Sequence, residues 1–305
     1  MNTQKCVESP LVAAATARLV DTIGRDYLIS MYQESYNVDV AEYFVSADSV
    51  KIYECEVTGY RFYYPFELAG KESLYRQLEA TSDGKYQDDK WEYRKALTFM
   101  QSSSLVLDVG CGKGAFVKLA NEAGHDAFGL ELNSASAAEA RQNGLKVSAQ
   151  LIGEHTKTHR NVYDAVCSFQ VLEHIAAVRE FIQDCISVVR PGGLIIFGVP
   201  NNQAFVGYDR RAALNMPPHH MGLWTERSLR ALPTAFPMDL KSIAFEPLKE
   251  IDWYAAVMER RYLRNNTMRS LYYKLGLASC YRRWVRKRAY RIPGHTILAI
   301  YEKRR

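Results

Sequence analysis

Short apolar runs alternate with amphipathic stretches through the middle of the chain. The apolar runs predict buried strands, and the stretches between them have the spacing of helices. Strands that alternate with helices are typical of parallel βαβ units, so we predict an α/β fold with a doubly wound sheet. The predicted strands are Ser104–Val109, Asp126–Glu131, Tyr163–Ser168 and Gly193–Val199, and the predicted helices are Gly114–Ala123, Ser134–Gln142 and Ala176–Val189.

The patterns on either side of this region are weaker. Residues 1–50 predict an amphipathic helix followed by a turn region, and residues 51–66 predict an aromatic hairpin that turns near Thr58-Gly59. Residues 71–100 have helical character, and Gly294–Tyr301 predicts a last strand. We therefore divide the chain into an N-terminal accessory or lid region (1–90), a core (91–254), and a basic helical segment with the last strand (255–305).

A glycine-rich loop follows the first strand of the core. Asp108 lies near the end of that strand, and Gly110, Gly112 and Gly114 form a G-x-G-x-G turn into the next helix. Glycines permit a tight turn and let a ligand approach the backbone closely. Glu131 ends the second strand, 19 residues after Gly112, where an acid can accept both hydroxyls of a ribose. Because Asp108 would repel a pyrophosphate, the arrangement favours a nucleoside with a positive charge, such as S-adenosylmethionine.

These segments resemble the motifs of class I S-adenosylmethionine-dependent methyltransferases. LDVGCGKG (107–114) and GLELN (129–133) are similar to the first two motifs of that family. YDAVCSFQVLEHI (163–175) and RPGGLIIFGVPN (190–201) are similar to the motifs of its fourth and fifth strands. The resemblance implies a Rossmann-like sheet, mostly parallel with an antiparallel final strand. It also implies that the basic segment is a helical insertion in the last hairpin.

The resemblance implies S-adenosylmethionine as the cofactor and suggests its contacts. The methionine portion is expected at the glycine loop, the ribose at Glu131 and Asn133, the adenine near Leu151, and the transferred methyl near Phe169 and Gln170. The predicted cofactor-binding residues are Asp108, Gly110, Gly112, Gly114, Glu131, Leu132, Asn133, Leu151, Phe169 and Gln170.

The acceptor side should follow the fifth strand. Methyl transfer to a hydroxyl requires an aligned acceptor and the removal of its proton. The run PPHHMGLWT (217–225) offers His219 and His220, and an ordinary histidine pKa of about 6.5 suits a general base. We predict these two residues as catalytic, with His219 preferred. The alternative is that they hold their loop through hydrogen bonds to the backbone.

Two nearby groups leave alternatives open. Glu173 and His174 follow the fourth strand and either tie their loop to neighbouring backbone, which we favour, or assist catalysis or hold a metal, as suggested for quinone O-methyltransferases that they resemble. We predict no metal. Polar residues after the fifth strand either contact the substrate or lie in a solvated loop; they are Asn201, Tyr208, Asp209 and Arg210.

Charge is distributed unevenly along the 305 residues. The net charge is +5, from 39 Lys+Arg and 34 Asp+Glu. Residues 255–305 carry 14 Lys+Arg against 2 Asp+Glu, a net +12, which leaves −7 for the first 254 residues. Basic residues lie beside aromatic ones between 256 and 290. This composition suits an anionic membrane surface or nucleic acid, or a helical cover with one buried face. Of the two ligands, nucleic acid is the less favoured partner.

The six cysteines show no CxxC pair, which favours a reducing, cytoplasmic setting, peripheral to the membrane if the basic segment docks there. The segment around CEVTG (55–59), with Tyr75 and Tyr86 further on, resembles methyltransferases of bacterial surface-polysaccharide gene clusters. Several of those carry a second cysteine where Thr58 stands here, so a zinc site is not expected. The aromatic residues there either form a lid and sugar platform or pack the hairpin.

The predicted function is therefore S-adenosylmethionine-dependent methyl transfer. The leading acceptor is a sugar hydroxyl of a nucleotide sugar or a lipid-linked polysaccharide. The alternatives are a quinone or other small-molecule O-methyltransferase and an RNA methyltransferase that uses the basic segment. A binding module without catalytic activity is disfavoured by the intact glycine loop and Glu131.

Overall fold

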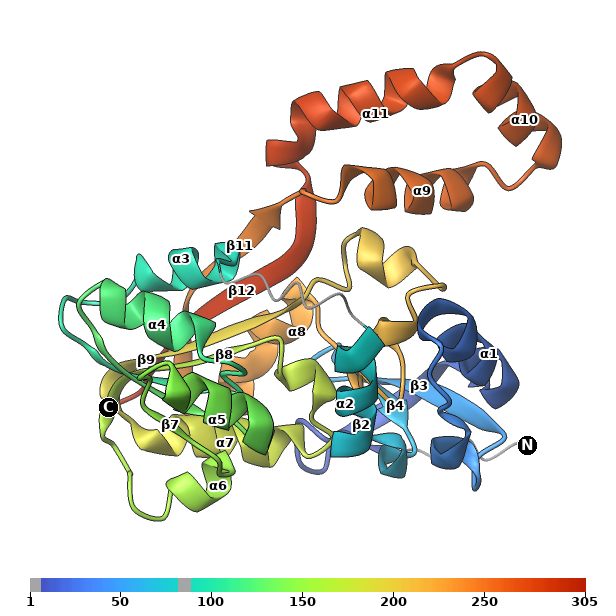
Figure 1. Ribbon diagram of the computed structural model, residues 1–305. Coiled ribbons are helices and arrows are strands. Elements are labelled where there is room, and N and C mark those ends of the chain that lie inside the picture. Colours follow the sequence, from blue (N-terminus) through green and yellow to red (C-terminus); the bar gives the residue numbers. More distant parts are fainter. Residues whose placement is uncertain (1–6, 82–88) are drawn as a thin grey trace.

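A computed structural model describes residues 7–81 and 89–305 of the chain. Its centre is a seven-stranded sheet in the order β11-β12-β9-β8-β5-β6-β7 (Figure 1). The strands β5 to β9 are parallel, and β12 runs antiparallel to both of its neighbours, so the predicted sheet type is confirmed. The strands are β5 Leu105–Val109, β6 Asp126–Leu130, β7 Val147–Ser148, β8 Tyr163–Phe169, β9 Val189–Pro200, β11 Met238–Pro247 and β12 Pro293–Lys303.

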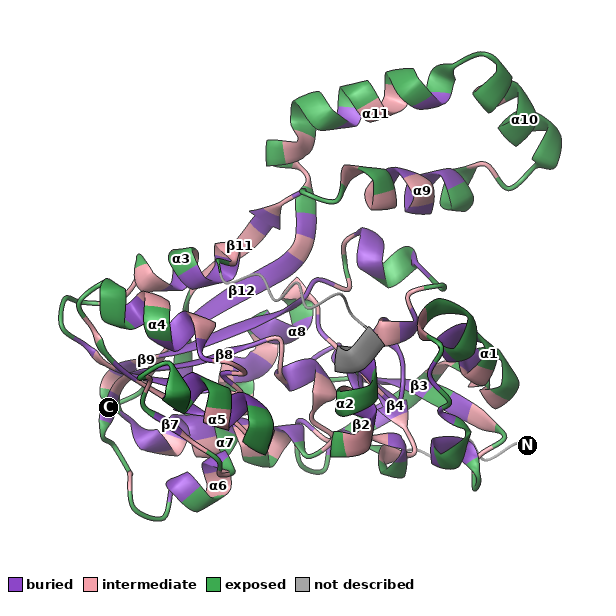
Figure 2. Cartoon of the chain, in the orientation of Figure 1, coloured by how far each residue is buried: buried purple, intermediate pink, exposed green. Residues whose placement is uncertain are grey.

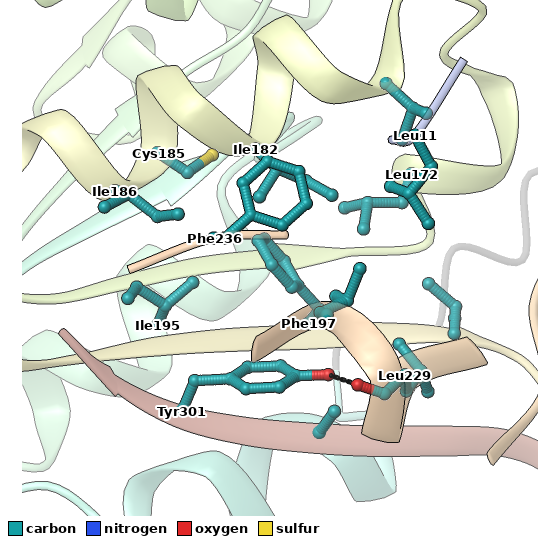
Figure 3. Close-up of a cluster of buried hydrophobic side chains, with 14 of the residues drawn as sticks. Leu11, Leu172, Ile182, Cys185, Ile186, Ile195, Phe197, Leu229, Phe236 and Tyr301 are labelled. Carbon is teal, nitrogen blue, oxygen red and sulfur yellow. Dashed lines mark hydrogen bonds between the residues drawn. The ribbon is translucent and has the colours of Figure 1, made fainter. Parts of the chain in front are cut away.

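Helices cover both faces of this sheet. Figure 3 shows one face, where Ile182 and Ile186 of α7 meet Phe197 of β9 and Phe236, while Tyr301 of β12 donates a hydrogen bond to the Leu229 carbonyl at 2.8 Å. The opposite face buries apolar side chains of α3, α4 and α5. The helices are α3 Trp91–Leu97, α4 Ala115–Glu122, α5 Ser134–Gln142, α6 Ile152–His155, α7 Val178–Val188 and α8 Glu226–Ala231.

A second sheet, in the order β1-β2-β3-β4-β10, lies beside the first. Its last strand, β10 (Gly222–Leu223), comes from the segment after the histidine pair and pairs with β4. The N-terminal sheet is therefore tied to the acceptor side of the core. Its other elements are β1 Val7–Glu8, β2 Thr16–Gly24, α1 Arg25–Tyr36, β3 Ser49–Cys55, β4 Arg61–Tyr64 and α2 Glu72–Thr81.

The prediction for residues 1–50 was wrong in its first half. The helix begins only at Arg25, and the residues before it form β2, which pairs with β3 along nearly its whole length. A long-range pairing partner decided this, because the alternation in β2 is weak and only Ala17 of the strand is buried. The predicted hairpin is confirmed: the Cys55 amide donates to the Tyr60 carbonyl at 2.8 Å, and Gly59 takes a φ of 68°.

The basic segment forms a helical arm, which we define as residues 251–291. Its helices are α9 Ile251–Tyr262, α10 Asn266–Lys274 and α11 Leu277–Arg288, and they lie between β11 and β12, as the resemblance implied. Figure 1 shows α10 and α11 projecting away from both sheets, and Figure 2 shows them mostly exposed. Val257 and Val285 pack with Phe205 and Leu248 at the base of the arm. Within the described ranges, 7–81 and 89–305, no helix has the length and apolar character needed to cross a membrane.

Candidate active site

The glycine loop is folded tightly between the ends of β5, β6 and β8. Gly110, Gly112 and Gly114 all have positive φ, at 79°, 54° and 82°. The Gly110 amide donates to the Leu130 carbonyl of β6 at 2.8 Å. A β-carbon on Gly110 would lie 2.5 Å from a methyl group of Val171, in the loop after β8. Both the conformation and the close approach require glycine at this position.

Glu131 is held in place by two backbone amides. Its Oε2 accepts a hydrogen bond from the Gly112 amide at 2.8 Å, and its Oε1 accepts one from the Asn133 amide at 2.7 Å. A carboxylate has about four acceptor positions, so each oxygen keeps one for a ligand hydroxyl. The carboxylate is therefore fixed in orientation and still able to accept two vicinal hydroxyls. The Asn133 side chain caps α5 by accepting from the Ala135 and Ser136 amides.

Asp108 is a buried carboxyl group that lacks a hydrogen-bond partner for one of its oxygens among the described residues. Its side chain is almost inaccessible, and its Oδ1 has no hydrogen-bond partner among the described residues. Burial, with a smaller contribution from Glu131, raises the pKa of Asp108 to about 8. An ammonium group placed here would supply the missing donor and favour the ionised carboxylate. The pair of Asp108 and Glu131 thus fits a cofactor with an amino-acid portion and a ribose.

Two apolar side chains are exposed beyond Glu131. Leu132 and Leu151 have 61% and 56% of their surface exposed, which is high for leucine. The Glu131 amide donates to the carbonyl of Ser148 at 3.1 Å, and Leu151 follows three residues later at the start of α6. Leu132 and Leu151 thus lie on two neighbouring segments, and their exposed apolar side chains suit packing against the two faces of an adenine ring.

The region after β8 differs from the prediction in one residue. The ring of Phe169 lies in the core, 4.9 Å from the ring of Tyr93 and 4.8 Å from that of Phe116, so the Phe169 side chain packs against helices and does not face a cofactor. Strand alternation explains this, because neighbouring side chains of a strand point to opposite faces. Gln170 leaves the strand with a φ of 57°, and its side chain approaches Glu92 at 3.4 Å.

Three histidines meet at the acceptor side, and we call His174, His219 and His220 the histidine cluster. One ring nitrogen from each lies within 4.8 Å of the others. The ring centroids are 4.6 to 4.8 Å apart. Val171, which packs over Gly110, precedes His174 by three residues, so the cluster adjoins the glycine loop.

The cluster is held by hydrogen bonds from distant segments. His174 Nδ1 lies 2.8 Å from the His219 carbonyl, and the Met221 amide donates to the Glu173 carbonyl at 2.6 Å. The His219 amide donates to the hydroxyl of Tyr32 at 3.3 Å. The favoured backbone role of residues 173 and 174 is therefore present, and His174 in addition joins the predicted pair.

Burial shifts the pKa values of the three histidines and of Glu173. It lowers the pKa of His174 to about 4 and that of His219 to about 3, and it also lowers the pKa of His220. All three rings are therefore neutral near pH 7 and carry a lone pair. Burial raises the pKa of Glu173 to about 8, and its Oε2 has no partner among the described residues.

Tyr75 was not predicted as a site residue, although it belongs to the aromatic run of the N-terminal region. Its ring lies 5.6 Å from the rings of both His174 and His219, and its hydroxyl is 3.4 Å from His174 Nδ1. No local signal in the sequence distinguishes Tyr75 from the other tyrosines.

The other aromatic residues of the N-terminal region mostly pack the hairpin. Tyr53, Tyr60 and Phe62 are buried and near one another. Tyr86 lies outside the described residues.

Asp209 is neither a solvated loop residue nor open to substrate. It is buried, and it accepts hydrogen bonds from the Trp253 indole at 2.7 Å and from Arg260 at 3.0 Å. Arg261 lies over the ring of Tyr208, 3.6 Å from its centroid. The loop after β9 therefore anchors the helical arm on the acceptor side.

Known proteins resemble the central part of this chain. Residues 86–236 match the family described as "Methyltransferase domain". A ubiquinone biosynthesis O-methyltransferase of Cronobacter sakazakii is 33% identical over 105 residues, which are 32% of this chain and 43% of that protein. The corresponding protein of Pectobacterium carotovorum is 32% identical over 105 residues. The chain thus spans less than half the length of these relatives.

Solved structures show the same fold at low identity. An S-adenosylmethionine-dependent methyltransferase from Archaeoglobus fulgidus superposes with a TM-score of 0.50 and 17% identity, over 77% of this chain and all of that one. A methyltransferase in complex with the Trm112 activator of Haloferax volcanii superposes with a TM-score of 0.51 and 16% identity, over 73% of this chain and 95% of that chain. Residues 86–236 are therefore similar to a methyltransferase domain, and the chain has the fold of solved S-adenosylmethionine-dependent methyltransferases.

Proposed function

We propose that this protein transfers the methyl group of S-adenosylmethionine to a hydroxyl oxygen of its acceptor. The observation that carries the proposal is the position of the histidine cluster directly beside the cofactor loop, through Val171 and Gly110. Glu131 would bind the ribose, Asp108 the ammonium of the methionine portion, and Leu132 and Leu151 the adenine. Gly112 and Gly114 would shape the loop around the cofactor.

The chemical step is an in-line displacement. A bond forms between the acceptor oxygen and the methyl carbon while the bond from that carbon to sulfur breaks, which releases S-adenosylhomocysteine. The acceptor also loses its hydroxyl proton. His219 and His220 are the groups that we propose to assist this loss, because they are neutral at pH 7 and lie on the acceptor side.

The acceptor that we propose first is a sugar hydroxyl, of a nucleotide sugar or a lipid-linked polysaccharide. The resemblance of the N-terminal region supports it. A phenolic hydroxyl of a quinone precursor is the second candidate, because the curated relatives are named ubiquinone biosynthesis O-methyltransferases. The phenol is the more acidic of the two hydroxyls, so it would need less assistance with its proton.

We further propose that the helical arm docks on an anionic membrane surface. Residues 256–290 contain ten Lys and Arg and a single acidic residue, Glu259, which is buried between Tyr273 and Arg282 inside the arm. Basic residues beside exposed apolar ones suit a lipid interface more than RNA, which has no apolar surface of comparable extent. The exposed apolar side chains of the arm are Tyr262, Met268, Leu271, Tyr273, Leu275, Leu277, Trp284 and Tyr290.

The test of the enzymatic proposal has two stages. Calorimetry with S-adenosylmethionine should show one binding site per chain, and no binding would refute the proposal. Labelled cofactor is then incubated with a panel of nucleotide sugars, lipid-linked glycans, catechols and RNA. Label in a sugar supports the first acceptor, label in a catechol replaces it with the second, and label in RNA alone contradicts both.

A further inference from the structure

We propose that a cavity between the helical arm and the loop after β9 binds a diphosphate group of the acceptor. The cavity has a volume of about 350 Å³. Its lining residues are Arg211, Ala256, Glu259, Arg260, Arg269 and Tyr273. The binding inference stands on this cavity and its charges; that the diphosphate belongs to a methyl acceptor rests on the function proposed above.

Three separate elements bring arginines to this cavity. Arg211 comes from the loop after β9, Arg260 from α9 and Arg269 from α10. Figure 1 shows α9 beside that loop, and Asp209 ties the two together, because it accepts hydrogen bonds from Arg260 at 3.0 Å and from the Trp253 indole at 2.7 Å. Its carboxylate also accepts the backbone amide of Arg211 at 3.1 Å. The arginines therefore converge because the arm packs on this loop.

Two carboxylates belong to this region, and both already have cationic partners. Asp209 is buried and paired with Arg260. Glu259 is also buried, with Arg282 at 3.0 Å and the Tyr273 hydroxyl donating to it at 2.6 Å. The negative charge of both acids is thus compensated by these partners, and the charge of the other cavity arginines is not.

Arg211 and Arg269 keep their charge for a ligand. Among the residues that the structure describes, neither guanidinium forms an ion pair with an acid, and Arg269 donates to an uncharged group, the side-chain oxygen of Asn266, at 3.2 Å. Both side chains are exposed. A guanidinium presents a planar fork of N–H donors that matches the oxygens of a phosphate. A bound anion would also relieve the repulsion among arginines that line one cavity.

Volume and charge favour a diphosphate. The cavity falls in the range of small-molecule sites, roughly 300–1,000 Å³, and so has room for more than a single phosphate. Two arginines without an acidic partner match the two negative charges of a diphosphate that links two organic groups. Nucleotide sugars and lipid-linked glycans, the acceptors that we propose first, both contain such a group, and a quinone precursor does not.

A short segment joins the cavity to the histidine cluster. Arg211 precedes Leu214 by three residues, and the Leu214 carbonyl lies 2.9 Å from His219 Nδ1. Three residues of chain span at most roughly 11 Å, so the Arg211 backbone lies within roughly 17 Å of this ring nitrogen. One acceptor that consists of a diphosphate and a sugar can therefore contact both places, with the diphosphate in the cavity and a sugar hydroxyl near the cluster.

The test measures UDP binding by the full chain, apart from activity. Calorimetry with UDP should show one site per chain, and an equal concentration of sulfate should not displace the nucleotide. Arg211→Gln with Arg269→Gln should weaken UDP binding at least tenfold, because the double variant loses charge-assisted hydrogen bonds of two guanidinium groups. Arg283→Gln with Arg286→Gln is the matched control. It removes the same charge from α11, outside the cavity, and should leave the dissociation constant within twofold.

A polyprenyl diphosphate in detergent micelles is the second probe, and it distinguishes the sources of the diphosphate. Binding of UDP assigns the site to nucleotide sugars, and binding of the lipid without UDP assigns it to lipid-linked glycans, provided that the cavity variant loses more affinity than the control.

Absence of binding of both probes to the wild-type chain overturns the proposal, and so do equal losses in the two double variants or displacement by sulfate. Calorimetry with S-adenosylmethionine on the same samples separates the two proposals. Cofactor binding without binding of either probe refutes only the diphosphate site, and probe binding without cofactor binding refutes only the methyl transfer.

Discussion

The cofactor side and the acceptor side of this molecule are built in different ways. On the cofactor side, the glycine loop and Glu131 lie within 24 residues of one another in the sequence, and backbone amides position the carboxylate. On the acceptor side, the histidine cluster joins the loop after β8 to a segment some 45 residues later, and Tyr75 arrives from the N-terminal region. The first side is a local motif, and the second exists only in the folded chain.

The two sides also differ in electrostatics. Asp108 and Glu131 offer acceptor oxygens, which suit the donors and positive charge of the proposed cofactor. The histidine cluster is neutral near pH 7, with His220 buried and the other two half-buried, and a ring nitrogen of each lies near an oxygen: the His219 carbonyl, the Leu214 carbonyl and Asn215 Oδ1. Substitutions on one side should therefore alter cofactor affinity, and substitutions on the other should alter turnover with cofactor affinity retained.

The largest effect is expected on the acceptor side. Replacing His219 and His220 together by Ala should lower turnover roughly 10²- to 10⁴-fold, because assistance with proton removal contributes about that much. The dissociation constant of S-adenosylmethionine, measured by calorimetry, should stay within twofold. Weakened cofactor binding in the double variant would show that the acceptor side also contributes to cofactor affinity.

The helical arm extends the acceptor side, because Asp209 anchors it there. Arg283→Gln, Arg286→Gln and Lys287→Gln together remove three exposed charges of α11. Each basic residue near an anionic surface contributes about 1 kcal/mol, so binding to vesicles that contain phosphatidylserine should weaken on the order of a hundredfold. The matched control neutralises Lys51, Lys118 and Lys157 on the body. Equal losses in both triple variants would argue against docking through the arm.

On the cofactor side, Glu131→Ala should weaken S-adenosylmethionine binding. Hydrogen bonds to a charged group contribute about 1.5–3 kcal/mol, which corresponds to roughly 10- to 150-fold in the dissociation constant. Glu122→Ala, an exposed acid on α4, is the control and should leave it unchanged. An unaltered affinity in Glu131→Ala would mean that the ribose binds elsewhere.

The smallest effect concerns stability and pH at Asp108. The folded pKa of Asp108, about 8, lies above its ordinary value of 3.8, so the stability associated with its protonated form is present in acid and is lost as the pH rises through 8. The free energy of unfolding should be measured at pH 6 and at pH 9. Between these two pH values it should fall by roughly 2 kcal/mol more in the wild type than in Asp108→Asn. Asp26→Asn, at an exposed acid, should show no such difference. Parallel pH profiles for wild type and Asp108→Asn would contradict the buried, unpaired carboxyl.

Local patterns were sufficient for most strands of the core sheet, but not for β7 and β11, over whose ranges no strand was predicted. The predicted strands around Asp108 and Glu131 are present within one residue at their ends, and α5 spans the predicted range, because these apolar runs are bounded by glycines and a capping asparagine. The first strands of the chain were missed. β1 is only two residues long and pairs with β2, while the other partner of β2 is β3, some 30 residues later; the alternation in β2 itself is weak.

Sequence alone determined the glycine loop to which we assign the cofactor, because its conformation depends on its own glycines and on the ends of the neighbouring strands that carry Asp108 and Glu131. Tertiary structure decided the orientation of Phe169, the association of His174 with His219 and His220, and the use of Asp209 as an anchor for the arm. Each of these depends on which distant segment lies opposite a side chain. The spacing of residues along the chain does not predict which distant segments meet. That depends on how the two sheets and the loop after β9 pack together.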